Sequence, residues 1–122
     1  MSQLDDSIKE LLSIEGANGA AIVDVSSGMA LASGGNPGFD LNVAAAGNSN
    51  VVRAKLRTMQ EIDIDAEIED IMITLSNQYH LIRALNSRDT SGLFVYLVLD
   101  RTTANLALAR HKLNAVSGRI AI

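Results

Sequence analysis

The chain has no cysteine and no tryptophan, and its 122 residues include only one proline, two histidines, two tyrosines and two phenylalanines. Without cysteine it forms neither disulfides nor thiolate metal sites. The scarcity of aromatic rings argues against a surface on which nucleic-acid bases stack. A net charge of −4 also argues against nucleic acid as the main partner, because phosphate binding depends on clustered lysine and arginine.

Long apolar runs are missing as well. No run approaches the roughly 20 residues that a membrane-spanning helix needs, so we expect no membrane insertion. The first ten residues, MSQLDDSIKE, contain no basic region followed by an apolar stretch. We therefore expect no signal peptide and a cytoplasmic location. The length suits one domain, residues 1–122, that can bury roughly 65% of its unfolded surface.

Catalytic signatures are also absent. There is no phosphate-binding P-loop and no dinucleotide-binding GxGxxG pattern. Ser26 and Ser27 precede a glycine but lack the pattern of a nucleophile elbow. His80 falls in a predicted strand and His111 in a basic helix, and we interpret both as structural or solvated. We expect a protein that is not an enzyme, with no catalytic residue and no cofactor.

Residues 61–70, EIDIDAEIED, are dense in carboxylates. Asp63, Asp65 and Glu67 have the one-three-five spacing of a calcium-binding loop. The sixth position of such a loop is isoleucine here rather than glycine, and the twelfth is threonine rather than glutamate, so the match fails. We interpret the segment as a solvated acidic rim and expect no bound metal.

The strongest positive signal is the run LFVYLVLD, Leu93–Asp100, bounded by Gly92. It is too short for an ordinary helix, so we interpret it as a strand. Successive side chains of a strand point to opposite faces, and both faces of this one are apolar. An edge strand or a strand with one wet face would not have this pattern. We predict the central strand of a sheet with helices packed on both sides.

The remaining elements follow from periodicity and turn signals. Apolar spacing predicts helices at residues 3–15, at 41–61 after an Asp40 N-cap, and from a Thr102 or Thr103 cap to near the end. Alternation and glycine-rich turns predict strands at residues 19–25, 29–33, 68–76 and 79–85. Two hairpin-like groups separated by one helix favour an α/β sandwich over a doubly wound fold.

The second helix has two distinct faces. One should cover the sheet and carries Leu41, Ala44, Ala45, Val52, Leu56 and Met59. The nearly opposite face carries small, mostly uncharged residues: Val43, Ala46, Gly47, Asn50, Ala54 and Thr58. Two interpretations remain open for this face, an alanine-rich solvent face or a helix–helix interface, because small residues let two helix backbones approach closely.

The order of the elements and several motifs resemble the roadblock family, which is named from a dynein light chain. The resemblance extends over essentially the whole chain. It is carried by GANGAAIVDVSSGMALAS at residues 16–33, by the long second helix and by the hairpin ITLSNQYHLIRAL at residues 73–85. It implies a roadblock/profilin-like α/β sandwich: a five-stranded antiparallel sheet in the order 2-1-5-4-3, with one long helix on one face and two on the other.

The resemblance also implies a function. Roadblock proteins form homodimers by pairing their second helices and joining their third strands edge to edge, here near Met72 and Thr74. Bacterial members commonly bind Ras-like small GTPases, and some accelerate GTP hydrolysis without supplying a catalytic residue. We therefore expect a non-catalytic homodimeric regulator or adapter of a Ras-like small GTPase. The alternatives are a structural adapter without a nucleotide-dependent partner and a small-molecule sensor with a pocket in the sheet.

Overall fold

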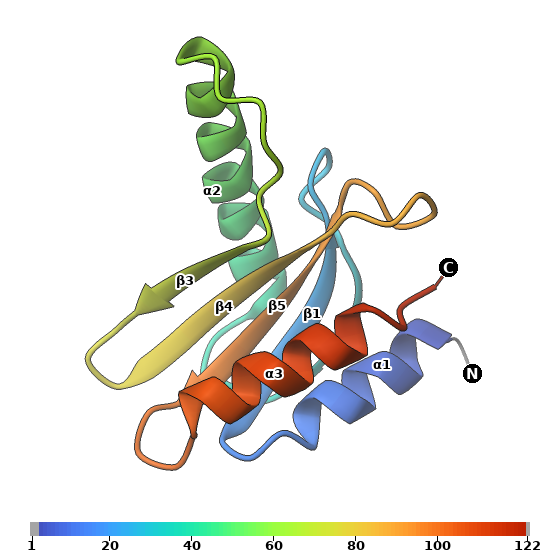
Figure 1. The fold of residues 1–122 in the computed structure, drawn as a ribbon. Coiled ribbons are helices and arrows are strands. Elements are labelled where there is room, and N and C mark those ends of the chain that lie inside the picture. Colours follow the sequence, from blue (N-terminus) through green and yellow to red (C-terminus); the bar gives the residue numbers. More distant parts are fainter. Residues whose placement is uncertain (1–2, 122) are drawn as a thin grey trace.

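The computed structural model describes residues 3–121 and contains one five-stranded antiparallel sheet in the order β2-β1-β5-β4-β3 (Figure 1). Helices α1 and α3 lie on one face of the sheet, and α2 lies on the other. In chain order the elements are α1 Gln3–Leu12, β1 Ala17–Asp24, β2 Ala30–Gly35, α2 Leu41–Glu61, β3 Asp70–Thr74, β4 Gln78–Leu85, β5 Leu93–Asp100 and α3 Leu106–Ser117. The predicted fold class and strand order are confirmed.

Strand β5 is the centre of the sheet. It pairs with β1 on one side and β4 on the other, and every residue from Leu93 to Leu99 is buried. Val95 and Leu97 point into the cluster beneath α1 and α3, whereas Phe94, Tyr96 and Val98 point into the cluster beneath α2. The two-sided apolar pattern is thus satisfied by helices on both faces.

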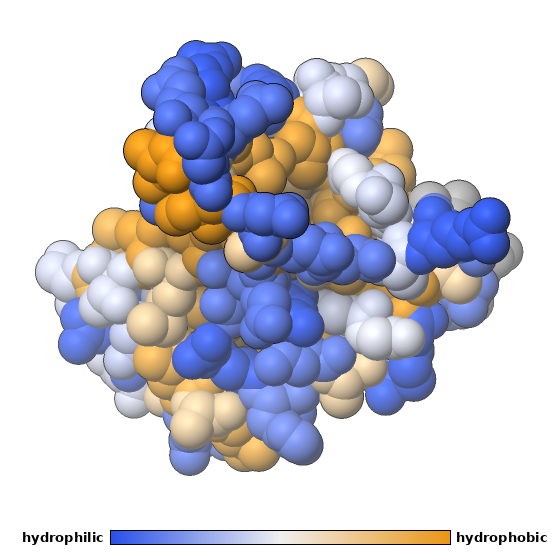
Figure 2. Space-filling model, turned by 45° about the horizontal axis from the view of Figure 1, so that its top comes forward, coloured by the Kyte–Doolittle hydropathy of each residue, from blue (hydrophilic) through white to orange (hydrophobic). Residues whose placement is uncertain are grey.

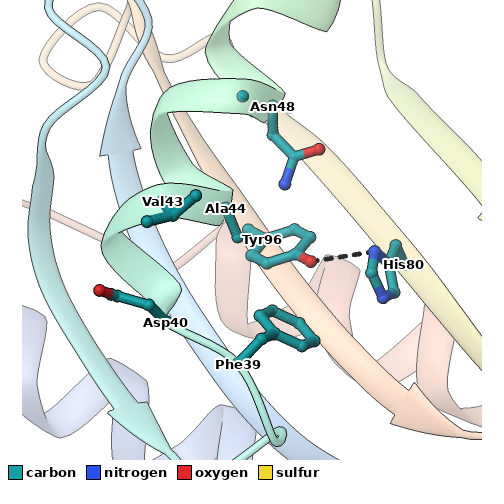
Figure 3. A pocket seen from close by; sticks show the side chains of 8 residues that line it. Phe39, Asp40, Val43, Ala44, Asn48, His80 and Tyr96 are labelled. Carbon is teal, nitrogen blue, oxygen red and sulfur yellow. Dashed lines mark hydrogen bonds between the residues drawn. The ribbon is translucent and has the colours of Figure 1, made fainter.

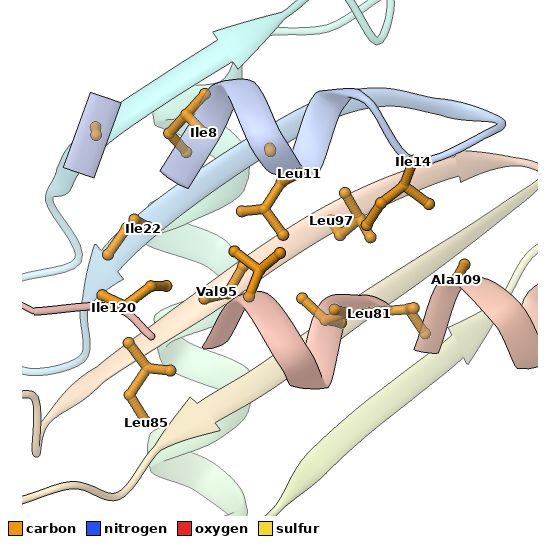
Figure 4. Packing of buried hydrophobic residues seen from close by; sticks show 14 of the residues in the cluster. Ile8, Leu11, Ile14, Ile22, Leu81, Leu85, Val95, Leu97, Ala109 and Ile120 are labelled. Atoms are coloured by element: carbon orange, nitrogen blue, oxygen red, sulfur yellow. The ribbon is translucent and has the colours of Figure 1, made fainter. Parts of the chain in front are cut away.

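The larger cluster lies between the sheet and the pair α1 and α3 (Figure 4). Leu11 of α1 and Leu113 of α3 are almost fully buried against Leu97 and its neighbours. Burying one such side chain contributes about 1.5–3 kcal/mol. Gly34 of β2 lets α1 come close, because a Cβ there would lie 2.8 Å from Cγ2 of Ile8.

The long helix α2 uses a smaller cluster. Ala45 and Val52 of the helix are buried in this cluster against side chains of the sheet. Asp40 is the N-cap, as predicted: its Oδ1 accepts a hydrogen bond of 2.8 Å from the backbone N–H of Asn42. The C-terminal half of α2 projects beyond the sheet (Figure 1). No helix within residues 3–121 is long and apolar enough to cross a membrane.

The ends of some elements differ from the prediction. Helix α1 ends at Leu12 rather than at residue 15, because the N–H of Ile14 bonds back to the carbonyl of Leu11 in a tighter turn. Helix α3 is capped by Asn105, whose Oδ1 accepts from the N–H of Leu108 at 3.1 Å. Thr102 is not the cap, since its N–H and its hydroxyl both donate to Oδ1 of Asp100.

Candidate functional site

The outer face of α2 is uncovered in this structure. All six residues of the predicted small-residue face are exposed: Val43, Ala46, Gly47, Asn50, Ala54 and Thr58. Val43 is 70% exposed, which is unusual for an aliphatic side chain in the middle of a charge-poor face. A Cβ built on Gly47 would meet nothing within 4 Å. Packing within the chain therefore does not explain this glycine, although glycine in a helix interior costs roughly 0.5–1 kcal/mol relative to alanine.

Further apolar side chains are exposed where α2 leaves the sheet. They are Val51, Leu56, Ile62 and Ile64, on the helix and on the segment that follows it. Figure 2 shows this end of the molecule, with hydrophobic side chains between groups of hydrophilic ones. Leu56 is predicted to cover the sheet but is 43% exposed, whereas Met59 of the same predicted face is buried.

Strand β3 forms one edge of the sheet and pairs only with β4. Met72, at 43% exposure, lies opposite Leu81, which belongs to the cluster beneath α1 and α3. Directly opposite residues of an antiparallel pair share a face. Met72 and Thr74 therefore point to the α1–α3 side, and the structure does not bring them together with the exposed face of α2. On the α2 side of this edge lies Ile71, opposite Ile82.

Residues 61–70, which connect α2 to β3, are largely exposed. Asp70 of this acidic segment forms an ion pair of 2.6 Å with Arg110 of α3. The backbone turns sharply at Asp63, whose φ is +58°. Within residues 3–121, no three His, Asp or Glu side chains are grouped so that they could hold a metal ion.

A pocket of about 420 Å³ opens between the first half of α2 and the sheet (Figure 3). Helix α2 and the loop before it supply most of the lining, and the sheet supplies two rings. The lining residues are Phe39, Asp40, Val43, Ala44, Gly47, Asn48, His80 and Tyr96. Val43 and Gly47 belong both to this pocket and to the small-residue face, so the two features adjoin.

A chain of hydrogen bonds crosses the floor of the pocket. His80 Nε2 lies 3.0 Å from Oε1 of Gln78, and His80 Nδ1 lies 2.9 Å from the hydroxyl of Tyr96. An amide oxygen only accepts, so Nε2 carries the proton and donates to Gln78. In the neutral ring Nδ1 then accepts from the hydroxyl of Tyr96. The sequence alone suggests a structural or solvated His80. The hydrogen bond to Tyr96 could not be predicted from it, because Gln78 and His80 lie on β4 and Tyr96 lies on β5.

Burial perturbs both ends of the His80–Tyr96 hydrogen bond. Partial burial lowers the pKa of His80, because the charged imidazolium is the form that loses most from desolvation. Burial raises the pKa of Tyr96, while hydrogen bonding to the Asn48 side chain acts in the opposite direction. The rings of His80 and Phe39 lie 5.8 Å apart, and those of His80 and Tyr96 lie 5.5 Å apart edge to face.

The other residues considered for chemistry have local partners. The hydroxyls of Ser26 and Ser27 donate to the Asp24 carboxylate, and the bond from Ser27 is the main cause of a lowered Asp24 pKa. This arrangement stabilises the turn before β2. A serine that donates to a carboxylate without an intervening base lacks the geometry of an activated nucleophile. His111 is exposed on α3, away from the pocket.

Comparison with known proteins bears on the fold. No family model and no curated protein matches the sequence. A roadblock/LC7 domain from Streptomyces avermitilis is 13% identical with a TM-score of 0.80, over 96% of this chain and 93% of that one. Myxococcus xanthus MglB is 17% identical with a TM-score of 0.81, over 97% and 91%. An MglB described with a tetrameric arrangement is 16% identical with a TM-score of 0.75, over 92% and 80%. The chain has the roadblock fold.

Proposed function

We propose that this chain, which has the roadblock fold, is a non-catalytic homodimeric adapter or regulator that binds a Ras-like small GTPase. The observation that carries the proposal is the exposed face of α2, with Val43 70% exposed and Gly47 facing open space. A face of small, uncharged residues suits close packing against another helix. In this proposal the second helix belongs to another copy of the chain, which buries the same face.

The edge of β3 is the second part of the proposed dimer contact. Its outer backbone groups have no partner strand in the protomer. An antiparallel contact between two β3 strands would satisfy them and would bring the half-buried Ile71 of each copy towards the paired helices. Residues of the acidic segment would then approach one another, and the ion pair of Asp70 with Arg110 offsets part of that negative charge.

The GTPase is proposed from the fold and its resemblance to roadblock proteins. Roadblock proteins that regulate GTPases act by binding and remodelling their partner, so a protein of this kind needs a surface rather than a reactive group. The described part of the chain offers exposed apolar side chains near the end of α2, such as Ile62 and Ile64, beside acidic ones. Such a mixture suits a reversible protein contact.

The test is retention of a Ras-like small GTPase from the same genome on the immobilised chain, with the GTPase loaded with GDP or with a non-hydrolysable GTP analogue. We expect retention that differs between the two nucleotide states. Phosphate release by the GTPase, measured with and without the chain, then shows whether hydrolysis is stimulated. Equal retention in both states would favour a structural adapter, and no retention by any such GTPase would contradict the proposal.

A further inference from the structure

We propose that a cavity between the end of α3 and the end of β4 binds a small monocarboxylate. The cavity has a volume of about 150 Å³, and its lining comes from β4, from the loop between β4 and β5, and from the last turn of α3. None of the lining residues belongs to α2, to β3 or to the acidic segment. The proposed dimer and GTPase contacts would therefore leave this cavity open.

The first argument is an arginine of the lining that has no counter-charge. Arg83 lies directly opposite Asp70 in the β3–β4 pairing, so the two side chains share a face. That face is the α1–α3 side, because Leu81, two residues before Arg83, belongs to the cluster there. Asp70, however, pairs with Arg110 of α3 at 2.6 Å, and Arg83 pairs with no carboxylate within residues 3–121. This half-buried corner thus holds two cations and one carboxylate, and a bound anion would balance it.

The second argument is a buried hydroxyl without a partner. Ser117 lines the cavity from α3 and is 8% exposed, and its Oγ has no hydrogen-bond partner in the described part of the chain. Leaving a buried hydroxyl unpaired is unfavourable, so a bound acceptor would stabilise it. Asn114, one turn earlier on α3, adds a side-chain amide that can also donate. Two uncharged donors therefore accompany the arginine.

The third argument concerns the charge and shape of the anion. One unpaired arginine balances one negative charge, and its planar fork matches the two oxygens of a carboxylate. The end of α3 borders the cavity at Gly118, and the partial negative charge of a helix C-terminus disfavours a doubly charged anion such as phosphate. Ala84 and Leu85 supply an apolar wall for a short carbon chain. These features together favour a small monocarboxylate.

The loop side of the cavity is held in place before any ligand binds. Asn86 Nδ2 donates to the carbonyl oxygen of Ile68 at 3.3 Å, and the hydroxyls of Ser87 and the buried Thr90 bond to each other. The N–H of Leu93 donates to the carbonyl of Thr90 at 3.1 Å. A wall that is already ordered loses little conformational freedom on binding, which favours affinity for a small ligand.

Propionate is the probe, with propionamide as an uncharged analogue of the same shape and phosphate as an anion of higher charge. Two-dimensional NMR of the backbone amides, at constant ionic strength, provides the readout. We expect propionate to shift the resonances of Ser117 and Gly118 with a Kd on the order of 10 mM, and to leave that of Gly47 unchanged. Propionamide and phosphate should bind at least about tenfold more weakly.

Two arginines form a matched pair of variants. Arg83→Gln removes the unpaired cation and should weaken propionate binding by at least about tenfold. Arg88→Gln makes the same change at an exposed position of the loop outside the lining and should leave binding unchanged. Arg83→Lys keeps the charge without the planar fork, so its affinity should lie between those of Arg83→Gln and the wild type. A heat-denaturation curve for each variant shows that it remains folded.

Ser117→Ala separates recognition from structure. We expect it to weaken propionate binding by about tenfold, because a hydrogen bond to the carboxylate is lost. It should not lower Tm, because the hydroxyl that it removes has no partner in the unliganded chain. A variant with a lower Tm and unchanged propionate binding would mean that this serine serves the fold alone, which would contradict the proposal.

Three further results would overturn the proposal. Equal binding of propionate and propionamide, or unchanged propionate binding by Arg83→Gln, would mean that no carboxylate is recognised at this arginine. Tighter binding of phosphate than of propionate would assign the cavity to another class of anion. Tighter binding of N-acetylaspartate amide than of propionate would assign it to an acidic side chain of a protein partner rather than to a free carboxylate.

Discussion

His80 is a half-buried residue whose environment favours one protonation state. Its ring donates to Gln78 and accepts from Tyr96. Protonation of Nδ1 would place two donors against each other, unless the hydroxyl of Tyr96 turned round to donate elsewhere. The lowered pKa and the hydrogen-bond pattern thus agree that the folded protein disfavours the imidazolium.

This residue predicts a pH dependence of stability. Because the pKa of His80 is lower in the folded chain than its ordinary value of about 6.5, the unfolded chain binds this proton more readily. The contribution is fully present above about pH 6.5 and is lost as the pH falls through the folded pKa. Urea denaturation between pH 5 and pH 8 should therefore show falling stability on the acid side.

His80→Gln should flatten that dependence, and His111→Gln, which changes an exposed ring, should keep it. Asp24 and Asp100 also have lowered pKa values, but their ordinary value of 3.8 confines their effect to more acidic solutions. An unchanged slope in His80→Gln would show that another group is responsible.

Val95 provides a test of the core. It is fully buried on β5, beneath α1 and α3. We expect Val95→Asp to unfold the protein, because burying an unpaired carboxylate costs several kcal/mol out of a total stability of about 5–15 kcal/mol. Leu31→Asp is the control, since Leu31 is 48% exposed on the edge strand β2. Circular dichroism should show a folded control, and an unchanged melting temperature of Val95→Asp would refute the assignment.

At the scale of elements, the sequence was informative where a local rule decides the outcome. The Asp40 cap follows from a short-range pattern, and so does the two-sided burial of β5. The predicted threonine cap of α3 is wrong. The side chains of Thr102, Thr103 and Asn105 can all accept a capping hydrogen bond, but Thr102 donates its N–H and its hydroxyl to Asp100 instead. The face of the sheet to which Met72 or Ile71 points depends on strand register, so local sequence does not predict it. The pocket combines side chains from distant segments, so local sequence does not predict it either.

The cap of α3 can be tested by substitution. Asn105→Ala should cost about 0.5–2 kcal/mol, because it leaves the N–H of Leu108 without its partner. For a chain of this size that loss lowers Tm by several degrees, as measured by calorimetry. Thr103→Ala, a change at an exposed and alternative candidate, should leave Tm nearly unchanged. A larger loss of Tm in Thr103→Ala than in Asn105→Ala would show that the threonine is the cap.

Helix α2 is tested by Gly47→Arg. The side chain would enter open space in the protomer, so we expect the circular dichroism spectrum to remain near that of the wild type. In sedimentation the mass should shift from dimer towards monomer, since a charged side chain prevents close helix packing. Gly118→Arg is the matched control at an exposed glycine that ends α3 on the other face of the sheet. A fully dimeric Gly47→Arg variant, or a monomeric wild type at tens of micromolar, would leave this face as a solvent face.

At the scale of the whole molecule, the fold could be predicted because two kinds of information agree. The buried strand β5 requires helices on both faces, and the resemblance supplies a strand order that places this strand in the middle. The projection of α2 beyond the sheet could not be predicted, since the length of a helix does not fix where it crosses a sheet. In this half of the helix Leu56 is 43% exposed, whereas Met59 remains buried.

The sheet has two different open edges, β2 and β3, and this sets how copies of the chain can add to one another. If β3 met β3, the contact would be symmetric, and assembly would stop at a pair. If β3 of one copy paired with β2 of the next, every added copy would leave one edge strand unpaired, and the assembly would grow into a filament. The register shift in the β1–β2 pairing and the consecutive glycines Gly34 and Gly35 make β2 a poor template for such growth. The irregular edge thereby favours a closed assembly over an endless one.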